Sequence, residues 1–325
     1  MRVLFTGASS FTGYWFAEAL AQVGHEVMCI YTKPAEAYEG IRGKRVRMLA
    51  DKVSQVFGPR FGDAAFLELL DGEPPFDAIC HHAADAKNHK AANFDCARAL
   101  AENVRGINEV MQRARARGVS VFVATGTYFE AGEGVGTPPL EAFSPYALSK
   151  GLTWQVFRYY ASQHGLKLGK FVLPNPIGLY DEPRFLEHLF RSWRRGEPAS
   201  VRTPDYVRDN APVALLARTY CDFLVGVHGG AAGLAQRNPS GWVETVGEFA
   251  SRVSRHVQEI SGHECPVHCH QQIDLQEPRA RANTEEILGG WSSEDEREFW
   301  RELWHESRPP SFESAAASGG GRKPV

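Results

Sequence analysis

Long apolar runs and an excess of charge of one sign are both missing from this sequence of 325 residues. Its apolar runs fall well short of the roughly 20 residues that cross a bilayer, so no membrane segment is expected. The 36 basic and 39 acidic residues give a net charge of -3, and this lack of basic bias implies no nucleic-acid partner. A strand-forming run directly follows Met1 and Arg2, which leaves no room for a signal peptide, so we expect a cytoplasmic protein.

Cysteine is also scarce. The 6 cysteines are scattered, and most lie in apolar surroundings typical of buried free thiols. Only the segment from His263 to His270 is dense enough in soft ligands to suggest zinc. Alternation through Val267, Cys269 and Gln271 instead predicts a strand, on which adjacent side chains point to opposite faces. We therefore expect no metal site.

The beginning of the sequence predicts a strand, a tight turn and a helix. Arg2 to Thr6 is rich in strand formers, and Tyr14 to Val23 has apolar residues at helical spacing. The glycines of the turn between them permit a sharp bend and close packing of helix on strand, so free N–H groups can face a pyrophosphate. The residues concerned are Gly7, Ser9, Ser10, Phe11, Thr12 and Gly13. Ser10 replaces the middle glycine of the usual pattern, and glycines that merely shape the turn are the alternative interpretation.

The second predicted strand, His25 to Tyr31, lacks the terminal acidic residue that holds the adenosine ribose in dinucleotide folds. Tyr31 stands in that place, and Lys33 follows it. A missing carboxylate and a nearby cation favour NADP(H), with NAD(H) possible, unless Lys33 is simply a solvated loop residue. A third strand is predicted over Val46 to Asp51, with Asp51 within reach of the adenine.

Strands continue to alternate with helices through residue 164. A buried fourth strand leads into a loop where Ala83 and Ala84 let the backbone lie against a cofactor. Helices are predicted over 61–70, 94–117 and 146–164, and a fifth strand over 119–127. This alternation predicts an α/β fold with a doubly wound parallel sheet of the Rossmann type, whose chemistry lies at the carboxyl ends of the strands.

A hydroxyl and a tyrosine–lysine pair fall at such positions. Thr127 ends the fifth strand, and Tyr146 and Lys150 stand one turn apart near the start of a helix, on the same face. A phenol has a pKa of about 10, and a neighbouring ammonium lowers that pKa toward working pH. The Thr127 hydroxyl can hold the substrate oxygen that takes the proton. Such a pair occurs by chance in helices, but three distant segments together describe one redox site.

These segments resemble the extended short-chain dehydrogenase/reductases that act on nucleotide sugars, the NAD-dependent epimerase/dehydratase family. The resemblance extends from residue 1 to about residue 305 and is carried by residues 6–13, His82-Ala83-Ala84, the strand ending at Thr127, and residues 146–150. It implies that Tyr146 is the acid/base and that Lys150 holds the nicotinamide ribose. It also implies that Thr127 binds the reacting oxygen, since Thr125 on the same strand fits the family spacing less well.

The resemblance further implies substrate contacts. Asn175 would contact the substrate, and Arg202, which matches an Arg-x6-Asp pattern with Asp209, would bind the diphosphate of a nucleotide sugar. An ordinary surface arginine is the alternative for Arg202. We expect a dinucleotide-binding domain, a smaller C-terminal substrate-binding lobe and a disordered tail. The dinucleotide domain would span 1–175 with a return segment near 205–235, the lobe 176–204 and 236–308, and the tail 309–325.

The absence of acidic residues directly after Thr127 limits which reactions of this family are expected. Family dehydratases and decarboxylases carry acidic residues just after the catalytic threonine, and one epimerase-reductase branch carries a cysteine, whereas Tyr128 and Phe129 stand here. Two reactions of the family remain compatible with this sequence, the reduction of a 4-keto sugar and 4-epimerisation. Tyr31, Lys33 and the similarity of residues 126–130 to certain deoxysugar 4-ketoreductases favour NADPH-dependent reduction of a nucleotide-linked (deoxy)sugar. A 4-epimerase with tightly bound NAD and a non-catalytic NADP-binding sensor are the alternatives.

The predicted helices 94–117 and 146–164 carry apolar residues beyond one face, among them Trp154, Phe157 and Tyr160. This indicates a partner surface as well as a core. In the family that the sequence resembles, the two helices form a dimer interface, so we expect a homodimer. Packing of all these residues within one subunit is the alternative.

Overall fold

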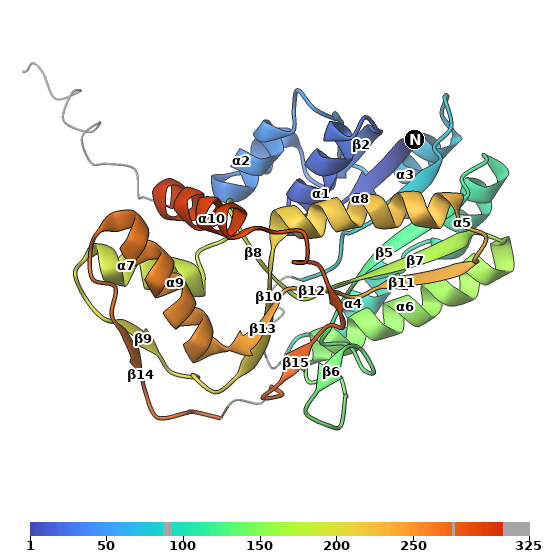
Figure 1. Ribbon diagram of the computed structural model, residues 1–325. Coiled ribbons are helices and arrows are strands. Elements are labelled where there is room, and N and C mark those ends of the chain that lie inside the picture. Colours follow the sequence, from blue (N-terminus) through green and yellow to red (C-terminus); the bar gives the residue numbers. More distant parts are fainter. Residues whose placement is uncertain (87–90, 92, 275–276, 308–325) are drawn as a thin grey trace, which may run out of the picture.

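The computed structural model describes residues 1–86, 91, 93–274 and 277–307. A seven-stranded sheet in the order β11-β7-β5-β4-β1-β2-β3 forms its centre, and every neighbouring pair is parallel (Figure 1). The predicted doubly wound parallel sheet is therefore confirmed. Its strands are β1 (Arg2–Thr6), β2 (Glu26–Tyr31), β3 (Ser54–Phe57), β4 (Ala78–His81), β5 (Val121–Thr127), β7 (Lys167–Leu173) and β11 (Leu234–Arg237).

Alternating side chains along the strands give the sheet a hydrophobic core on each face. Val3 and Phe5 of β1 belong to one core, and Leu4 between them belongs to the other. Helices α1 (Phe11–Gln22), α2 (Gly40–Met48) and α8 (Val213–Gly229) cover the first face. Helices α3 (Ala64–Asp71), α5 (Ile107–Ala116) and α6 (Pro145–His164) cover the second, with α4 (Cys96–Asn103) packed on α6. Figure 1 shows α1 and α8 above the sheet and α6 below it.

A third core lies outside the large sheet, around the fully buried Trp300. Its elements form the lobe at the left of Figure 1, beside the three-stranded sheet β13-β10-β8. The lobe contains α7 (Phe185–Arg194), β9 (Ala199–Val201), α9 (Val246–Ser261), β14 (Val267–Cys269) and α10 (Ser293–Glu306). The strands of the three-stranded sheet are β8 (Asn175–Ile177), β10 (Val207–Pro212) and β13 (Trp242–Thr245). Two small pairs complete the fold, β12 (Pro239–Ser240) with β16 (Glu285–Glu286) and β15 (Arg281–Ala282) with β6 (Val135–Gly136).

Two predicted elements are wrong. Residues 46–51 form no strand, because 46–48 are the end of helix α2 and a turn follows. Val46 packs into the core with Leu49 at helical spacing, and β3 comes later. The single helix predicted over 94–117 is two helices, α4 and α5. Gly106 between them has a left-handed backbone (φ 55°), and a Cβ there would meet the Gly62 carbonyl oxygen at 2.5 Å.

The segment from His263 to His270 contributes β14, which pairs with β9, as its alternation predicted. Among the residues described, no three metal-ligating side chains gather to hold an ion. Nor does that part of the chain contain a helix long and apolar enough to span a membrane. The predicted disordered tail, 309–325, lies outside the described residues.

A buried ion cluster supports the end of β5. Lys170 of β7 is 2% exposed, and its ammonium contacts Glu130 Oε2 and Glu133 Oε1, each at 2.6 Å. Glu130 Oε1 in turn accepts the backbone N–H of Thr127 at 2.8 Å. Because these charges are buried, each depends on the other partners for its solvation.

Replacing Lys170 by Met should therefore lower the free energy of unfolding by about 3–5 kcal/mol, because two carboxylates would stay buried without their cation. Urea denaturation followed by circular dichroism measures this change. The surface pair of Arg301 with Glu298 offers a control, since Arg301→Met should leave the midpoint almost unchanged. Equal effects of the two substitutions would contradict a structural role for the cluster.

Candidate active site

A cavity of about 1370 Å³ opens at the carboxyl ends of the strands. In the sheet, β1 has β2 and β3 on one side and β4, β5, β7 and β11 on the other. Its volume exceeds the roughly 300–1,000 Å³ of typical small-molecule pockets, which leaves room for a ligand as large as a dinucleotide. Most of the residues predicted from the sequence line it. They are Gly7, Ser9, Ser10, Phe11, Thr12, Tyr31, Ala83, Ala84, Thr127, Tyr146, Lys150 and Asn175.

The turn between β1 and α1 forms one wall of the cavity. Ser10 is the N-cap of α1: its hydroxyl donates to the Gly7 carbonyl at 2.8 Å and accepts the N–H of Gly13 at 3.1 Å. Gly13 lies behind the wall, and a Cβ at this position would meet Gly7 O at 2.2 Å. The side chain of Ser10 therefore points inward and completes the turn in place of the missing middle glycine.

This geometry fits a pyrophosphate. Because the Ser10 side chain caps the helix from inside, the start of α1 stays open to the cavity, where its N–H groups and dipole favour an anion. Gly7 has φ 88°, and a Cβ there would come within 2.7 Å of the Ala83 backbone nitrogen, so the turn and the β4 loop are in close contact. The chain's own residues thus form the cradle that a dinucleotide requires.

The adenosine corner differs from the prediction. Tyr31 lines the cavity and stacks on Phe57, with ring centroids 5.0 Å apart. Lys33 is exposed and does not line it. Asp51 is likewise exposed and away from the cavity, because the strand expected to end there is a helix followed by a turn. Two cations from neighbouring segments line the cavity, Arg60 and Arg42 of α2, which pairs with Glu182 at 3.8 Å, and the sequence reasoning missed both.

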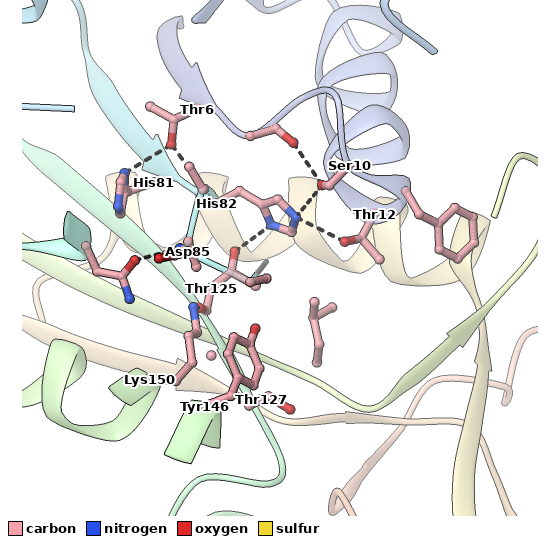
Figure 2. A pocket seen from close by; sticks show the side chains of 18 of the residues that line it. Thr6, Ser10, Thr12, His81, His82, Asp85, Thr125, Thr127, Tyr146 and Lys150 are labelled. Carbon is pink, nitrogen blue, oxygen red and sulfur yellow. Dashed lines mark hydrogen bonds between the residues drawn. The ribbon is translucent and has the colours of Figure 1, made fainter. Parts of the chain in front are cut away.

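Tyr146, Lys150 and Thr127 all line the cavity. Ser144 caps α6 by accepting the N–H of Ala147, so the helix begins at Pro145 and carries Tyr146 and Lys150 on its first turns. The Lys150 ammonium donates to the backbone carbonyl of Thr125. Figure 2 shows the two side chains beside β5, directed toward the space below the turn.

The acid–base properties of this pair differ from the prediction. Burial and, to a smaller extent, the Glu130 carboxylate raise the pKa of Tyr146 to about 12, so Lys150 does not bring it below its ordinary value. Burial also lowers the pKa of Lys150, which the Glu130 charge partly offsets. The phenol is therefore a proton donor in the structure as it stands.

Of the two residues predicted to contact the substrate, one lines the cavity and the other does not. Asn175 lines the cavity and donates from Nδ2 to Oδ1 of Asn210 at 2.6 Å. Arg202 is exposed on a bend after β9 and lies outside the cavity. Arg208 of β10 lines it instead, paired with Glu277 at 3.1 Å. The signal that was missed is the position of Arg208 in a strand, directly before the buried Asp209.

Comparison with known proteins agrees with this architecture. Residues 3–209 match the model of the NAD dependent epimerase/dehydratase family. No curated protein matches the sequence. Among solved structures, a UDP-glucuronic acid 4-epimerase from Bacillus cereus, in complex with UDP-glucuronic acid and NAD, is 14% identical (TM-score 0.69; 94% of this chain and 99% of that one covered). A UDP-glucose 4-epimerase from Thermotoga maritima is 19% identical (TM-score 0.68; 94% and 98% covered).

A third structure, the UDP-glucose 4-epimerase of Thermus thermophilus in complex with NAD, is 22% identical, with a TM-score of 0.66 and coverage of 94% and 99%. The fold and the cavity define an NAD(P)-dependent enzyme of the extended short-chain dehydrogenase/reductase type. Within that class, the chain belongs to the NAD-dependent epimerase/dehydratase family. A nicotinamide dinucleotide is accordingly its cofactor.

Gly13→Ala should disrupt the turn, because the added methyl group overlaps the Gly7 carbonyl. We expect the dissociation constant for the dinucleotide to rise about ten-fold or more, as measured by isothermal titration calorimetry. Gly226, in helix α8 with open space around it, provides the control, and Gly226→Ala should leave binding unchanged. Unaltered affinity in Gly13→Ala would contradict the assignment of the turn to cofactor binding.

Proposed function

We propose that the protein transfers hydride between a bound nicotinamide dinucleotide and C4 of a nucleotide-linked sugar, and that the net reaction is 4-epimerisation with NAD retained. The observation that carries this proposal is that Tyr146, Lys150 and Thr127 line the same cavity as the α1 turn. Family membership and the 4-epimerase neighbours support the epimerase over a reductase.

In this proposal each side chain has a defined task. A nicotinamide dinucleotide held by the α1 turn would supply the hydride transfer. Tyr146 exchanges the proton of the sugar C4 oxygen, and Thr127 holds that oxygen by a hydrogen bond from its hydroxyl. Lys150 holds the nicotinamide ribose, and its charge stabilises the phenolate whenever Tyr146 has given up its proton. Asn175 contacts the sugar nucleotide beside Arg208.

Reduction of a 4-keto sugar by NADPH is the second candidate, and the adenosine corner favours it. The residues between 31 and 42 that line the cavity are Tyr31, Thr32, Tyr38 and Arg42, and no carboxylate is among them. An arginine in this place accommodates a 2′-phosphate, whereas an acidic residue would bind the free ribose hydroxyls of NAD. Arg42 therefore takes the role predicted for Lys33.

The two candidates, and a non-catalytic sensor, differ in a simple assay. The small molecules released from purified protein are identified by mass spectrometry, and UDP-sugars are then incubated with the protein without added cofactor. Copurified NAD and interconversion of 4-epimers support the epimerase. NADPH oxidation with nucleotide-linked 4-keto-6-deoxysugars supports the reductase. Dinucleotide binding without turnover of any sugar would overturn both catalytic assignments.

Tyr146→Phe should lower kcat by about 10²- to 10⁴-fold, because the phenol hydroxyl that exchanges the proton is lost. Tyr159→Phe, on the exposed part of the same helix, should keep the wild-type rate. Because burial raises the pKa of Tyr146, the rate of alcohol oxidation by the wild type should increase with pH over the range in which the enzyme is stable. A pH-independent rate would contradict general base catalysis by Tyr146.

Arg208→Ala should raise KM for the nucleotide sugar about ten-fold or more, because a charge-assisted contact to the diphosphate would be lost. Arg202→Ala is the matched control and should leave KM unchanged, since Arg202 lies outside the cavity. Steady-state kinetics with UDP-sugars at saturating cofactor measures both values. The reverse pattern would restore the assignment based on the sequence.

We also propose that the protein is a homodimer through α4, α5 and α6, the helices in the predicted interface segments. Leu148 and Leu152 of α6 are 45% and 40% exposed, and Tyr159 is 61% exposed, so the helix presents apolar surface outside the core. Leu152→Glu should then shift the protein from dimer to monomer in light scattering after gel filtration. A wild-type monomer at micromolar concentration would contradict the interface.

A further inference from the structure

One side chain of the cavity wall is not used by the proposed chemistry. His82 follows β4 and lies between the α1 turn and β5, as Figure 2 shows. Its Nε2 is 3.1 Å from the Ser10 hydroxyl oxygen and 3.0 Å from that of Thr12. Its Nδ1 is 2.9 Å from the Thr125 hydroxyl oxygen. One imidazole therefore contacts hydroxyls of both the dinucleotide turn and the catalytic strand.

The ring is neutral. Burial and the Lys150 charge lower the pKa of His82 to about 3, so the imidazole carries a single N–H and a single acceptor nitrogen at working pH. The question is which nitrogen carries the proton, because that choice sets the direction of every hydrogen bond in the network.

Ser10 determines the tautomer. Its hydroxyl donates its only proton to the Gly7 carbonyl, so toward His82 its oxygen can only accept. The proton of the imidazole is therefore on Nε2, shared between the oxygens of Ser10 and Thr12. It follows that Nδ1 is the acceptor and that the Thr125 hydroxyl donates to it. The backbone carbonyl of Thr125 meanwhile accepts from Lys150.

This arrangement separates the two threonines of β5. The hydroxyl proton of Thr125 is committed to His82, whereas Thr127 accepts from the Phe129 N–H at 3.4 Å and keeps its own proton for a ligand. Thr12 receives the imidazole N–H, so its own proton points away from the ring, at the start of a helix that lines the cavity. His82 thus orients the hydroxyl of Thr12 in the α1 turn and the hydroxyl of Thr125 in β5.

We propose that His82 is a positioning residue that holds the α1 turn against β5 in the form that binds the dinucleotide, through an Nε2–H tautomer that donates to Ser10 and Thr12. The inference rests on the proposed function only in taking this cavity as the dinucleotide site. It predicts that His82 acts on cofactor affinity rather than on the chemical step.

The test measures the dissociation constant for NAD and for NADP by titration calorimetry in three variants. His82→Leu removes all three hydroxyl contacts and should raise the constant for the preferred dinucleotide about ten-fold. His82→Gln, whose amide can donate to Ser10 and Thr12, should stay within about three-fold of the wild type. His305→Leu, on the exposed end of α10, is the control and should have no effect. Wild-type affinity in His82→Leu overturns the proposal.

A second cycle tests the coupling itself. Ser10→Ala should weaken binding less in the His82→Leu background than in the wild type, because the two residues act through one contact. Additive effects would show that they act independently and would overturn the proposal. Thr125→Val, which removes the hydroxyl in contact with Nδ1 of His82, should also raise the dissociation constant, and wild-type affinity in this variant contradicts the assignment.

The tautomer can be observed in the wild-type protein, and a variant is needed only to assign the signal. Protein labelled with ¹⁵N-histidine should show a neutral ring with the proton on Nε2, assigned to His82 by its absence from the His82→Gln spectrum. A protonated Nδ1 or a cationic ring near pH 7 overturns the proposal. Calorimetry and NMR spectroscopy use no sugar substrate. The role of His82 can therefore be tested even if the protein epimerises no sugar.

Discussion

The parallel pairing of β1 with both β2 and β4 is the constraint on which the site depends. Its register places Thr6 opposite His81, and the pairing of β4 with β5 places His81 opposite Ala124. The chain leaves these strands at a common edge, so the α1 turn, the β4 loop and the end of β5 meet there. A dinucleotide site arises at this edge because the connections from β1 and β4 diverge to opposite sides.

Polar groups hold this edge together from two sides of β5. His82 links β5 to the dinucleotide turn through three hydroxyls, whereas Lys170 and Glu130 support the backbone of Thr127 from within the protein. Hydrogen bonds in such partly buried networks are directional, and each unpaired member would be costly. These contacts fix the relative positions of the α1 turn, the β4 loop and the end of β5.

Burial dominates the electrostatics of the site. It raises the pKa of Tyr146 and lowers those of Lys150 and His82, so each group is pushed toward its neutral form. The Glu130 carboxylate acts on both members of the pair: it raises the pKa of Tyr146 in the same direction as burial, and it partly offsets the effect of burial on the pKa of Lys150.

The sequence by itself determined the elements with strong local signals: the strand, turn and helix at the start, the alternation that gives a parallel sheet, and the Tyr146 and Lys150 pair on a capped helix. Local patterns are enough to predict these elements, because hydrophobic periodicity and the positions of glycines can be read from residues close together in the sequence. Only the tertiary structure decided that Arg42 and Arg208 line the cavity while Lys33, Asp51 and Arg202 do not, and that Ser10 points inward to His82. Such choices depend on which distant segments pack together, and no local pattern in the sequence encodes that contact.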